Sequence, residues 1–397
     1  MFPAILSSLL VASTLPTASN AFDIVKDYSG TNFFQGWDFY GSWDNLTLGD
    51  VWWLNQTEAT AEHLAYVNDA GHAIIRVDNT TNVPLNEKRN TVRITTQDLY
   101  DWGSLFIIDV LHIPYGCSVW PAFWTKGPTW PDDGEIDIIE SINLNPNNQM
   151  ALHTAGSCLK DDSVPQTGRN VGQDCSTGSG CVVVQTEQNS YGPGFAASGG
   201  GIWATQFDIS GIYMWYWGRA NIPANLAQAT STSSIDVSTW GTPSAAFPAN
   251  AKCNLTEHFT PQQLVIDITL CGDWAGVPSI YGSQCGHMGP TGTCYQDNVV
   301  GPGSPKYDNA FFEINYVRAY TATKAAPTAQ STASSATVLD GSSPTATTVV
   351  TVVTTGNPSG AQATALSTKS SAVKSVAASG IGLLAGVLMT FVMIDGL

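Results

Sequence analysis

Gly134-Glu-Ile-Asp-Ile-Ile-Glu140 is the stretch that says most about how this 397-residue chain folds. If it is a β-strand, side chains alternate, so Glu135 and Asp137 share one face and the isoleucines beside them share the other. Strict alternation would place Glu140 in the apolar interior, where an unpaired carboxylate is costly. A β-bulge at positions 138–139 avoids that cost, because one extra residue returns Glu140 to the acidic face. We therefore predict a bulged strand with an apolar core face and three carboxylates in a row on the opposite face.

Positions 22–321 show the same sequence pattern throughout. Short runs of β-branched and aromatic residues alternate with clusters of Gly, Pro, Asn and Asp, and no long segment has the apolar periodicity of a helix. This pattern predicts one all-β domain, an antiparallel β-sandwich of the jelly-roll kind. The clearest strand signals lie at 73–77, 104–110, 181–186, 211–217, 264–270 and 312–317.

The two ends of the chain differ from this domain. Residues 1–21 carry an apolar stretch followed by small residues, which is typical of a secretory signal peptide. Residues 322–369 are rich in Ser, Thr, Ala and Pro and contain no aromatic residue. Such a composition cannot bury enough apolar surface to fold, so we predict a disordered, O-glycosylated stalk.

Residues 370–397 have the layout of a GPI-anchor signal, with small residues, a polar spacer and an apolar tail that is removed on attachment. Ser370 is the predicted attachment residue, although Ser359, Gly360 and Ser367 are also small. The competing interpretation is a transmembrane helix, but the apolar run is shorter than the ~20 residues that span a bilayer, and no Lys or Arg follows it. We therefore predict a cell-surface protein anchored by lipid to the plasma membrane, with the cell wall left open as a further location.

Composition narrows the class of partner. The net charge is −17, with only 15 Lys and Arg residues, which argues against nucleic acids and anionic membrane surfaces. The chain has 13 Trp, 13 Tyr and 14 Phe, and although many must belong to the core, flat aromatic rings suit the C–H faces of sugars. These features favour a neutral carbohydrate as the partner, and we expect the protein to be a monomer.

Cysteines and glycosylation triplets agree with secretion. All eight Cys lie between 117 and 294, and no Cys-x-x-Cys pair suggests a zinc site, so we expect disulfides whose pairing the sequence leaves open. We expect no metal or cofactor to be required, while a structural calcium ion stays open. Asn-x-Thr acceptor triplets begin at Asn45, Asn55, Asn79 and Asn254.

Three neighbouring carboxyls have a chemical use. Like charges repel, so we expect their pKa values to be pushed apart and one group to stay protonated near neutral pH. Retaining cleavage of a glycosidic bond needs an ionised nucleophile and a protonated acid about 5–5.5 Å apart. Glu135 and Glu140 would fill these two roles, and Asp137 between them would hold a proton or a hydrogen bond and tune both. The spacing alone does not say which glutamate takes which role.

Simpler interpretations of the acids compete with this one. Glu-x-Asp-x-x-Glu is common as a bare pattern, and a solvated acidic edge strand or a calcium site would also explain it. The surrounding sequence favours a site, because the strand is apolar on its other face and several tryptophans precede it. In particular, Trp120-Pro-Ala-Phe-Trp124 lies just upstream, and Trp130 adjoins the acids.

These two stretches together resemble glycoside hydrolase family 16. The likeness is to its fungal-type endo-1,3(4)-β-glucanases, the laminarinases and mixed-linkage glucanases. It also takes in Tyr28-Ser-Gly-Thr-Asn-Phe-Phe-Gln-Gly-Trp37 and Cys271-Gly-Asp-Trp-Ala-Gly276, and therefore covers nearly all of 22–321.

The resemblance implies a jelly roll with a concave substrate cleft for β-glucan. It also implies that Glu135 is the nucleophile, Asp137 the assisting residue and Glu140 the acid/base. Tryptophans near the acids are candidates for stacking on sugars, with core packing as the alternative, and a histidine on a neighbouring strand is a candidate partner for Asp137. These candidate substrate-binding residues are Trp120, Trp124, Trp130 and His153.

Three functions fit this pattern. The first is endo-acting, retaining hydrolysis of β-1,3 and mixed β-1,3/1,4 glucans. The second is transglycosylation of cell-wall β-glucan on the same fold; wall-anchored relatives of that kind resemble Glu-x-Asp-x-Glu, so the extra isoleucine here favours hydrolysis. The third is a non-catalytic glucan-binding module, which is disfavoured because three repelling acids have no obvious benefit for binding alone.

Overall fold

The computed structural model describes residues 21–286, 289–322 and 328–329. Residues 1–20 of the predicted signal peptide, nearly all of the predicted stalk and the predicted anchor signal with Ser370 lie outside these residues. Among the helices of the described part, none is long and apolar enough to cross a membrane.

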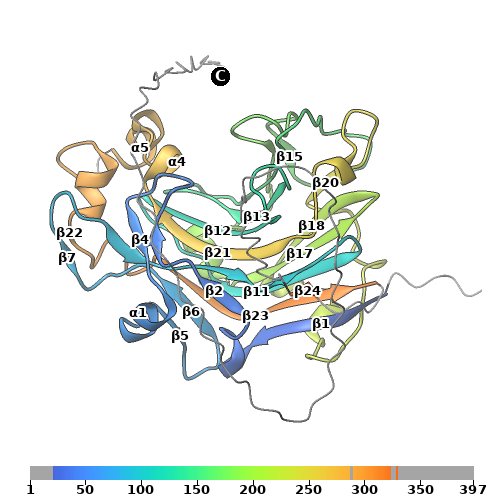
Figure 1. Ribbon diagram of the computed structural model, residues 1–397, viewed down its shortest axis with the longest axis horizontal. Helices are drawn as coiled ribbons and strands as arrows, with labels where there is room; N and C mark the ends of the chain where they lie inside the picture. Colours follow the sequence, from blue (N-terminus) through green and yellow to red (C-terminus); the bar gives the residue numbers. More distant parts are fainter. Residues whose placement is uncertain (1–20, 287–288, 323–327, 330–397) are drawn as a thin grey trace, which may run out of the picture. The chain divides into compact units, whose positions relative to one another are not determined.

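Two large antiparallel sheets form a sandwich, which confirms the predicted all-β class (Figure 1). The first sheet has nine strands, of which β6 pairs with β23 and β5 with β6, beside the main path. In order along that path, followed by the two side strands, they are β19 (Ile235–Asp236), β1 (Ala21–Ser29), β23 (Phe311–Thr321), β11 (Ser104–His112), β17 (Gly201–Asp208), β18 (Gly211–Gly218), β20 (Ala245–Pro248), β6 (Ala73–Arg76) and β5 (Ala65–Val67).

The second sheet has eight strands and carries the predicted acidic strand near its middle. Strands β12, β13 and β21 of this sheet are seen above β11, β23 and β1 of the first sheet in Figure 1. Across the sheet the order is β15 (Arg169–Asn170), β16 (Cys181–Val184), β14 (Gln149–His153), β13 (Glu135–Glu140), β12 (Val119–Lys126), β21 (Gln263–Leu270), β9 (Arg93–Thr96) and β2 (Trp37–Phe39).

Short elements surround the sandwich. The helices of the described residues have at most eight residues, in agreement with the missing helical periodicity. They are α1 (Gln56–Ala61), α2 (Gly192–Ala197), α3 (Ala224–Ala227), α4 (Gly272–Ala275) and α5 (Pro278–Cys285), with 3-10 turns at Gly30–Asn32, Arg219–Asn221 and Leu255–Glu257 and a π-helical turn at Tyr295–Val299. The small ladders join β3 (Ser42–Trp43), β4 (Val51–Trp53) and β8 (Arg89–Thr91), then β7 (Asn82–Val83) and β22 (Gly301–Pro302), then β10 (Asp98–Leu99) and β24 (Thr328–Ala329).

The main core lies between the two sheets, because each sheet turns one apolar face inward. The isoleucines of β13 belong to the same buried cluster as Phe106 and Ile108 of β11. All six of the clearest strand signals in the sequence correspond to strands here, namely β6, β11, β16, β18, β21 and β23. These strands were predicted as short runs of β-branched and aromatic residues bounded by turn residues, and two of them, β11 and β21, are buried along nearly their whole length.

All eight cysteines form disulfides, as expected, and the structure supplies the pairing that the sequence left open. Two of the four bonds lie in the loops beside β14 and β16, and two lie around α4 and α5. The pairs are Cys117–Cys285, Cys158–Cys253, Cys175–Cys181 and Cys271–Cys294. Four disulfides indicate an oxidising, secretory environment.

The predicted glycosylation positions differ in exposure. Asn45, Asn55 and Asn254 are exposed, whereas Asn79 is half-buried and its amide donates to Asp308 Oδ1 at 2.7 Å. Modification needs an accessible amide nitrogen, so the first three positions suit it better. Glycosylation itself stays a prediction at all four.

Candidate active site

The bulge in β13 is present where the sequence predicted it. Across β14, Asp137 is opposite Ala151 and Glu140 is opposite Gln149, so three steps along β13 match two along β14. Across β12, the register skips Ile138. One extra residue therefore returns Glu140 to the face that carries the other two acids, while the isoleucines face the core.

Hydrogen-bond donors on both neighbouring strands hold the two glutamates. Glu140 accepts bonds from Trp120 Nε1 on β12 (2.9 Å) and from Gln149 Nε2 on β14 (3.2 Å). Glu135 accepts one from Trp130 Nε1, in the loop that leads into β13. These contacts gather Glu135, Asp137 and Glu140 into one group, which we call the acid cluster.

His153 completes the cluster from β14, where it is directly opposite Glu135. Its Nε2 lies 3.2 Å from Asp137 Oδ2 and 3.9 Å from Glu135 Oε1. Asp137 Oδ2 is buried and has no hydrogen-bond partner among the described residues, and the imidazole is the group that could form an ion pair with it. The predicted approach of His153 to Asp137 from a neighbouring strand is thus present in the structure.

Burial raises the pKa of all three carboxyls. The pKa of Glu135 rises to about 8 through burial and then the charge of Asp137. That of Asp137 rises to about 8 through burial, opposed by a hydrogen bond with Glu135, and that of Glu140 rises to about 7 through burial and then the charge of Asp137. A protonated carboxyl near neutral pH is therefore present as expected. However, desolvation exceeds repulsion as its cause, and the three pKa values lie close together instead of far apart.

The sequence interpretation missed a second polar group beside the cluster. Glu140, Ala122, Asp267 and Arg93 lie in one row across β13, β12, β21 and β9. Asp267 accepts a hydrogen bond from Trp124 Nε1 (3.1 Å), and burial raises its pKa to about 7, opposed by the charge of Arg93. A lone Asp in the middle of an otherwise apolar strand was the available signal, because a buried carboxyl needs partners.

The three predicted tryptophans have different surroundings. Trp130 is 43% exposed beside Glu135, so part of its ring is open. Trp120 and Trp124 are nearly buried: the first meets Trp274 edge-on at 5.2 Å, and the Arg93 guanidinium lies 5.2 Å from the ring of the second. Of the three, only Trp130 combines contact with an acid and an accessible apolar surface.

The cavity found on the nine-stranded sheet does not include the acid cluster. It has a volume of about 800 Å³ and is lined by Asp109, Arg219 and Arg318 among others, and it contains none of the predicted site residues. The concave cleft implied by the family resemblance therefore stays a prediction.

A family model described as the XgeA-like, catalytic domain of glycoside hydrolase family 16 matches residues 37–320. The chain belongs to glycoside hydrolase family 16. The match begins at β2 and ends in β23, so this family 16 domain includes the acid cluster, its tryptophan donors and the whole of the eight-stranded sheet from β2 to β15.

Relatives of this family 16 domain carry names that refer to β-glucans. A probable endo-1,3(4)-beta-glucanase of Aspergillus niger is 36% identical over 321 residues, which are 79% of this chain and 42% of that protein. The chain spans about half the length of most relatives with this description. The solved laminarinase 16A from Phanerochaete chrysosporium, with β-glucans in donor and acceptor sites, is 34% identical, has a TM-score of 0.69, and is matched over 76% of this chain and 100% of its own. An elongating family 16 β-1,3-glucosyltransferase is 38% identical, with a TM-score of 0.69 and coverage of 76% and 100%.

Glu135, Asp137 and His153 are also residues of this family 16 domain that could hold a metal ion, since their ligand atoms lie within 4.8 Å of one another. Calcium prefers oxygen ligands alone, so a set that includes an imidazole does not fit the calcium ion left open by the sequence. The chemistry that the acids suggest uses carboxyls without a metal. That no metal is required stays a prediction.

Proposed function

We propose that this domain is an endo-acting, retaining hydrolase of β-1,3 and mixed β-1,3/1,4 glucans. The observation that carries the proposal is the bulge in β13, which places Glu140 on the same face as Glu135 and Asp137. Two carboxyls on one face, with at least one protonated near neutral pH, are what retaining cleavage needs. The names of the relatives, which refer to endo-1,3(4)-beta-glucanases and laminarinase, supply the substrate class.

The proposed reaction has two displacements. In the first, ionised Glu135 forms a bond to the anomeric carbon while the glycosidic C–O bond breaks, and Glu140 gives its proton to the leaving oxygen. In the second, Glu140 takes a proton from water, and the resulting hydroxyl oxygen displaces Glu135 from the anomeric carbon. Each displacement inverts the anomeric carbon, so the product keeps the β configuration.

Asp137 and the tryptophans support these steps. Asp137 is hydrogen-bonded to Glu135, and this bond lowers the pKa of Asp137. In the proposed reaction the two carboxyls share one proton, which passes to Asp137 when Glu135 attacks. Donation from Trp120 to Glu140 and from Trp130 to Glu135 fixes the direction of each carboxyl. The exposed face of Trp130 offers the apolar surface on which a glucose ring can stack.

The test is to change each glutamate to its amide and assay laminarin, lichenan and barley glucan, with linkage analysis of the products. We expect Glu135→Gln and Glu140→Gln each to lose about 1000-fold or more in kcat, while the exposed Glu87→Gln keeps wild-type activity. Azide added to Glu135→Gly should give an α-glycosyl azide, and azide added to Glu140→Gly should give the β-glycosyl azide. Full hydrolysis by either Gln variant would overturn the mechanism.

Transglycosylation is the second candidate, and one observation favours it. A solved family 16 enzyme at 38% identity is an elongating β-1,3-glucosyltransferase. In that reaction a sugar hydroxyl replaces water in the second displacement. Products longer than the starting oligosaccharide, formed in excess over hydrolysis products when laminarin oligosaccharides are supplied at high concentration, would make transfer the main activity. Glucan binding without turnover would instead identify a non-catalytic module.

We also propose where the protein works. Four disulfides agree with the secretory pathway, and the sequence of 370–397 suits a GPI anchor that holds a monomer at the cell surface. Release of the full-length protein from intact cells by phosphatidylinositol-specific phospholipase C would support the anchor. Persistence in the membrane fraction after that treatment would favour a transmembrane segment instead.

A further inference from the structure

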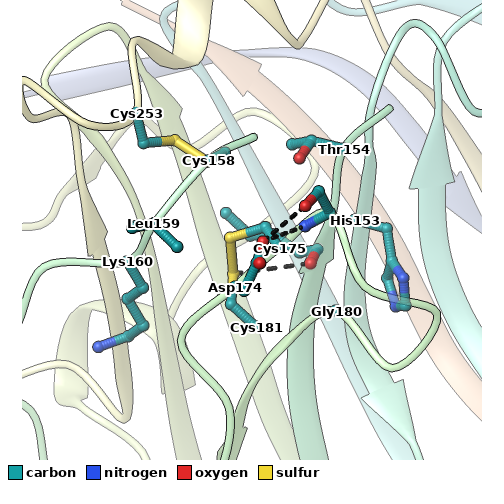
Figure 2. The surroundings of a disulfide bond; sticks show 12 residues. His153, Thr154, Cys158, Leu159, Lys160, Asp174, Cys175, Gly180, Cys181 and Cys253 are labelled. Carbon is teal, nitrogen blue, oxygen red and sulfur yellow. Dashed lines mark hydrogen bonds between the residues drawn. A yellow bond between two sulfur atoms is a disulfide. The ribbon is translucent and has the colours of Figure 1, made fainter. Parts of the chain in front are cut away.

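A small disulfide ring lies directly behind His153. Cys175 and Cys181 are bonded across a sequence separation of 6, and Figure 2 shows the bonded pair beside the backbone of the strand that carries His153. The backbone of β14 is tied to the ring on both sides of the histidine: Thr154 N donates to Cys175 O at 2.9 Å, and Leu152 is paired with Cys181. The ring is therefore attached to the strand that carries His153.

Gly180 is the point at which the ring touches the histidine side chain. Its φ is +67°, a conformation that favours glycine. A Cβ at this position would lie 2.8 Å from His153 Nε2 and 2.9 Å from its Cε1, and 2.6 Å from Leu152 O. A larger residue at this position would therefore crowd both the backbone of β14 at Leu152 and the imidazole.

The same nitrogen of the imidazole also lies near the acid cluster. It is 3.2 Å from Asp137 Oδ2, an oxygen with no hydrogen-bond partner among the described residues. His153 Nε2 is therefore the atom at which the ring backbone and Asp137 both approach the imidazole.

We propose that Gly180 and the Cys175–Cys181 disulfide are positioning residues for the reaction, which hold the His153 imidazole against Asp137 and Glu135. This inference rests on the proposed function of the acid cluster. The nearest atoms to a Cβ at Gly180 belong to His153 and Leu152, so the effect on the acids is expected to pass through the histidine.

A second disulfide keeps the ring in place. Cys175 N donates to Cys158 O at 2.9 Å, and Cys158 is bonded to Cys253. Cross-links of this kind limit the conformations open to a loop, and strands alone do not fix it, because β16 has only four residues. Breaking the Cys175–Cys181 bond therefore makes the loop next to His153 more mobile, while the Cys158–Cys253 bond stays intact.

The charge of His153 gives the positioning a measurable consequence. His153 lowers the pKa of Glu135 and of Glu140, against the larger effect of burial. If the imidazole moves away, the pKa of Glu135 rises further, and more alkaline conditions are needed to ionise the nucleophile. The acid limb of the kcat/KM profile then shifts to higher pH, which a loss of stability alone would not produce.

The experiment uses two perturbations of the ring in the full-length protein. Gly180→Ala puts a methyl group against the imidazole, and the double variant Cys175→Ser with Cys181→Ser opens the ring. For each we expect a kcat about 10-fold to 100-fold lower, a KM changed much less, and an acid limb at higher pH. Gly178→Ala lies in the same ring with open space around its Cβ, and Gly241→Ala has a φ of +75° and open space, so both controls should keep the wild-type profile.

A histidine variant makes the outcome decisive. In a His153→Ala background, Gly180→Ala and the opened ring should cause little further loss of kcat, because the side chain they act through is gone. Equal losses in both backgrounds, or wild-type pH profiles in both ring variants, would overturn the inference. If Glu135→Gln is inactive while the ring variants are normal, only this inference fails; if Glu135→Gln is active, the proposed function fails first.

Discussion

Two groups of carboxyls, one on each sheet, have opposite surroundings. On the nine-stranded sheet, Asp109 lies 2.5 Å from Arg219 and Asp27 lies 2.8 Å from Arg318. On the eight-stranded sheet, no Lys or Arg of the described residues forms an ion pair with the acid cluster, whose partners are indole and amide donors and His153. Both groups are set in β-strands, so the fold does not explain the difference.

The comparison separates structural acids from reactive ones. A guanidinium stabilises a carboxylate as an ion and leaves it little tendency to exchange protons. Without one, burial raises the pKa of the acid cluster into the range where protons are given and taken near neutral pH. The same lack of compensation costs stability whenever the cluster ionises.

The largest expected effect is a split between activity and stability in two matched amide variants. Asp137→Asn should lower kcat about 100-fold, because an amide cannot share a proton with Glu135. Asp109→Asn should leave kcat near wild type and lower the free energy of unfolding by about 1–3 kcal/mol, because it leaves Arg219 without its charged partner. Glucan assays and urea unfolding at one pH measure both. Loss of activity in Asp109→Asn at full stability would show that the two groups are not separate.

The acid cluster of the eight-stranded sheet could be predicted from the sequence, whereas the ion pairs of the nine-stranded sheet could not. The acid cluster was found because its three members are near neighbours on one strand, and because burying Glu140 in the core was too costly to accept. The Asp109–Arg219 pair joins residues that are far apart in sequence, so no local spacing reveals it. Asp267 and Arg93 were missed for the same reason, since their meeting depends on the order of β12, β21 and β9.

The fold shows the same division between local and distant information. Short runs of β-branched and aromatic residues indicated the six clearest strands, and alternation along 135–140 indicated the bulge, because both signals depend on residues a few positions apart. The disulfide pairing and the ring behind His153 depend on how distant loops meet, and eight cysteines in one chain do not encode that in their spacing. The pKa values clustered near 7 to 8 because burial, which the sequence does not measure, outweighed the expected repulsion.

A smaller effect concerns the dependence of stability on pH. The carboxyls of the acid cluster have raised pKa values in the folded state. Between about pH 4 and pH 8 the folded protein therefore binds more protons at these groups than the unfolded chain does. Their contribution to the free energy of unfolding falls as the pH rises through this window. We expect Asp137→Asn to flatten the fall of Tm across it and to have a Tm higher than wild type by about 2–4 °C at the alkaline end. Asp109→Asn should have a lower Tm than wild type, because Arg219 loses its charged partner. Equal slopes for wild type and Asp137→Asn in calorimetry would contradict the raised pKa of the cluster.

The smallest effect decides which glutamate is the acid. The hydrogen bond from Trp120 lowers the pKa of Glu140, so Trp120→Phe should raise that pKa by up to about one unit. An acid/base residue then stays protonated to higher pH, and the alkaline limb of kcat/KM moves upward; Trp124→Phe, whose indole donates to Asp267, should leave that limb in place. If the acid limb of Trp120→Phe moves instead, Glu140 must be ionised for the first step. The roles of the two glutamates would then be exchanged, while the bulge that brings them together would serve either assignment equally well.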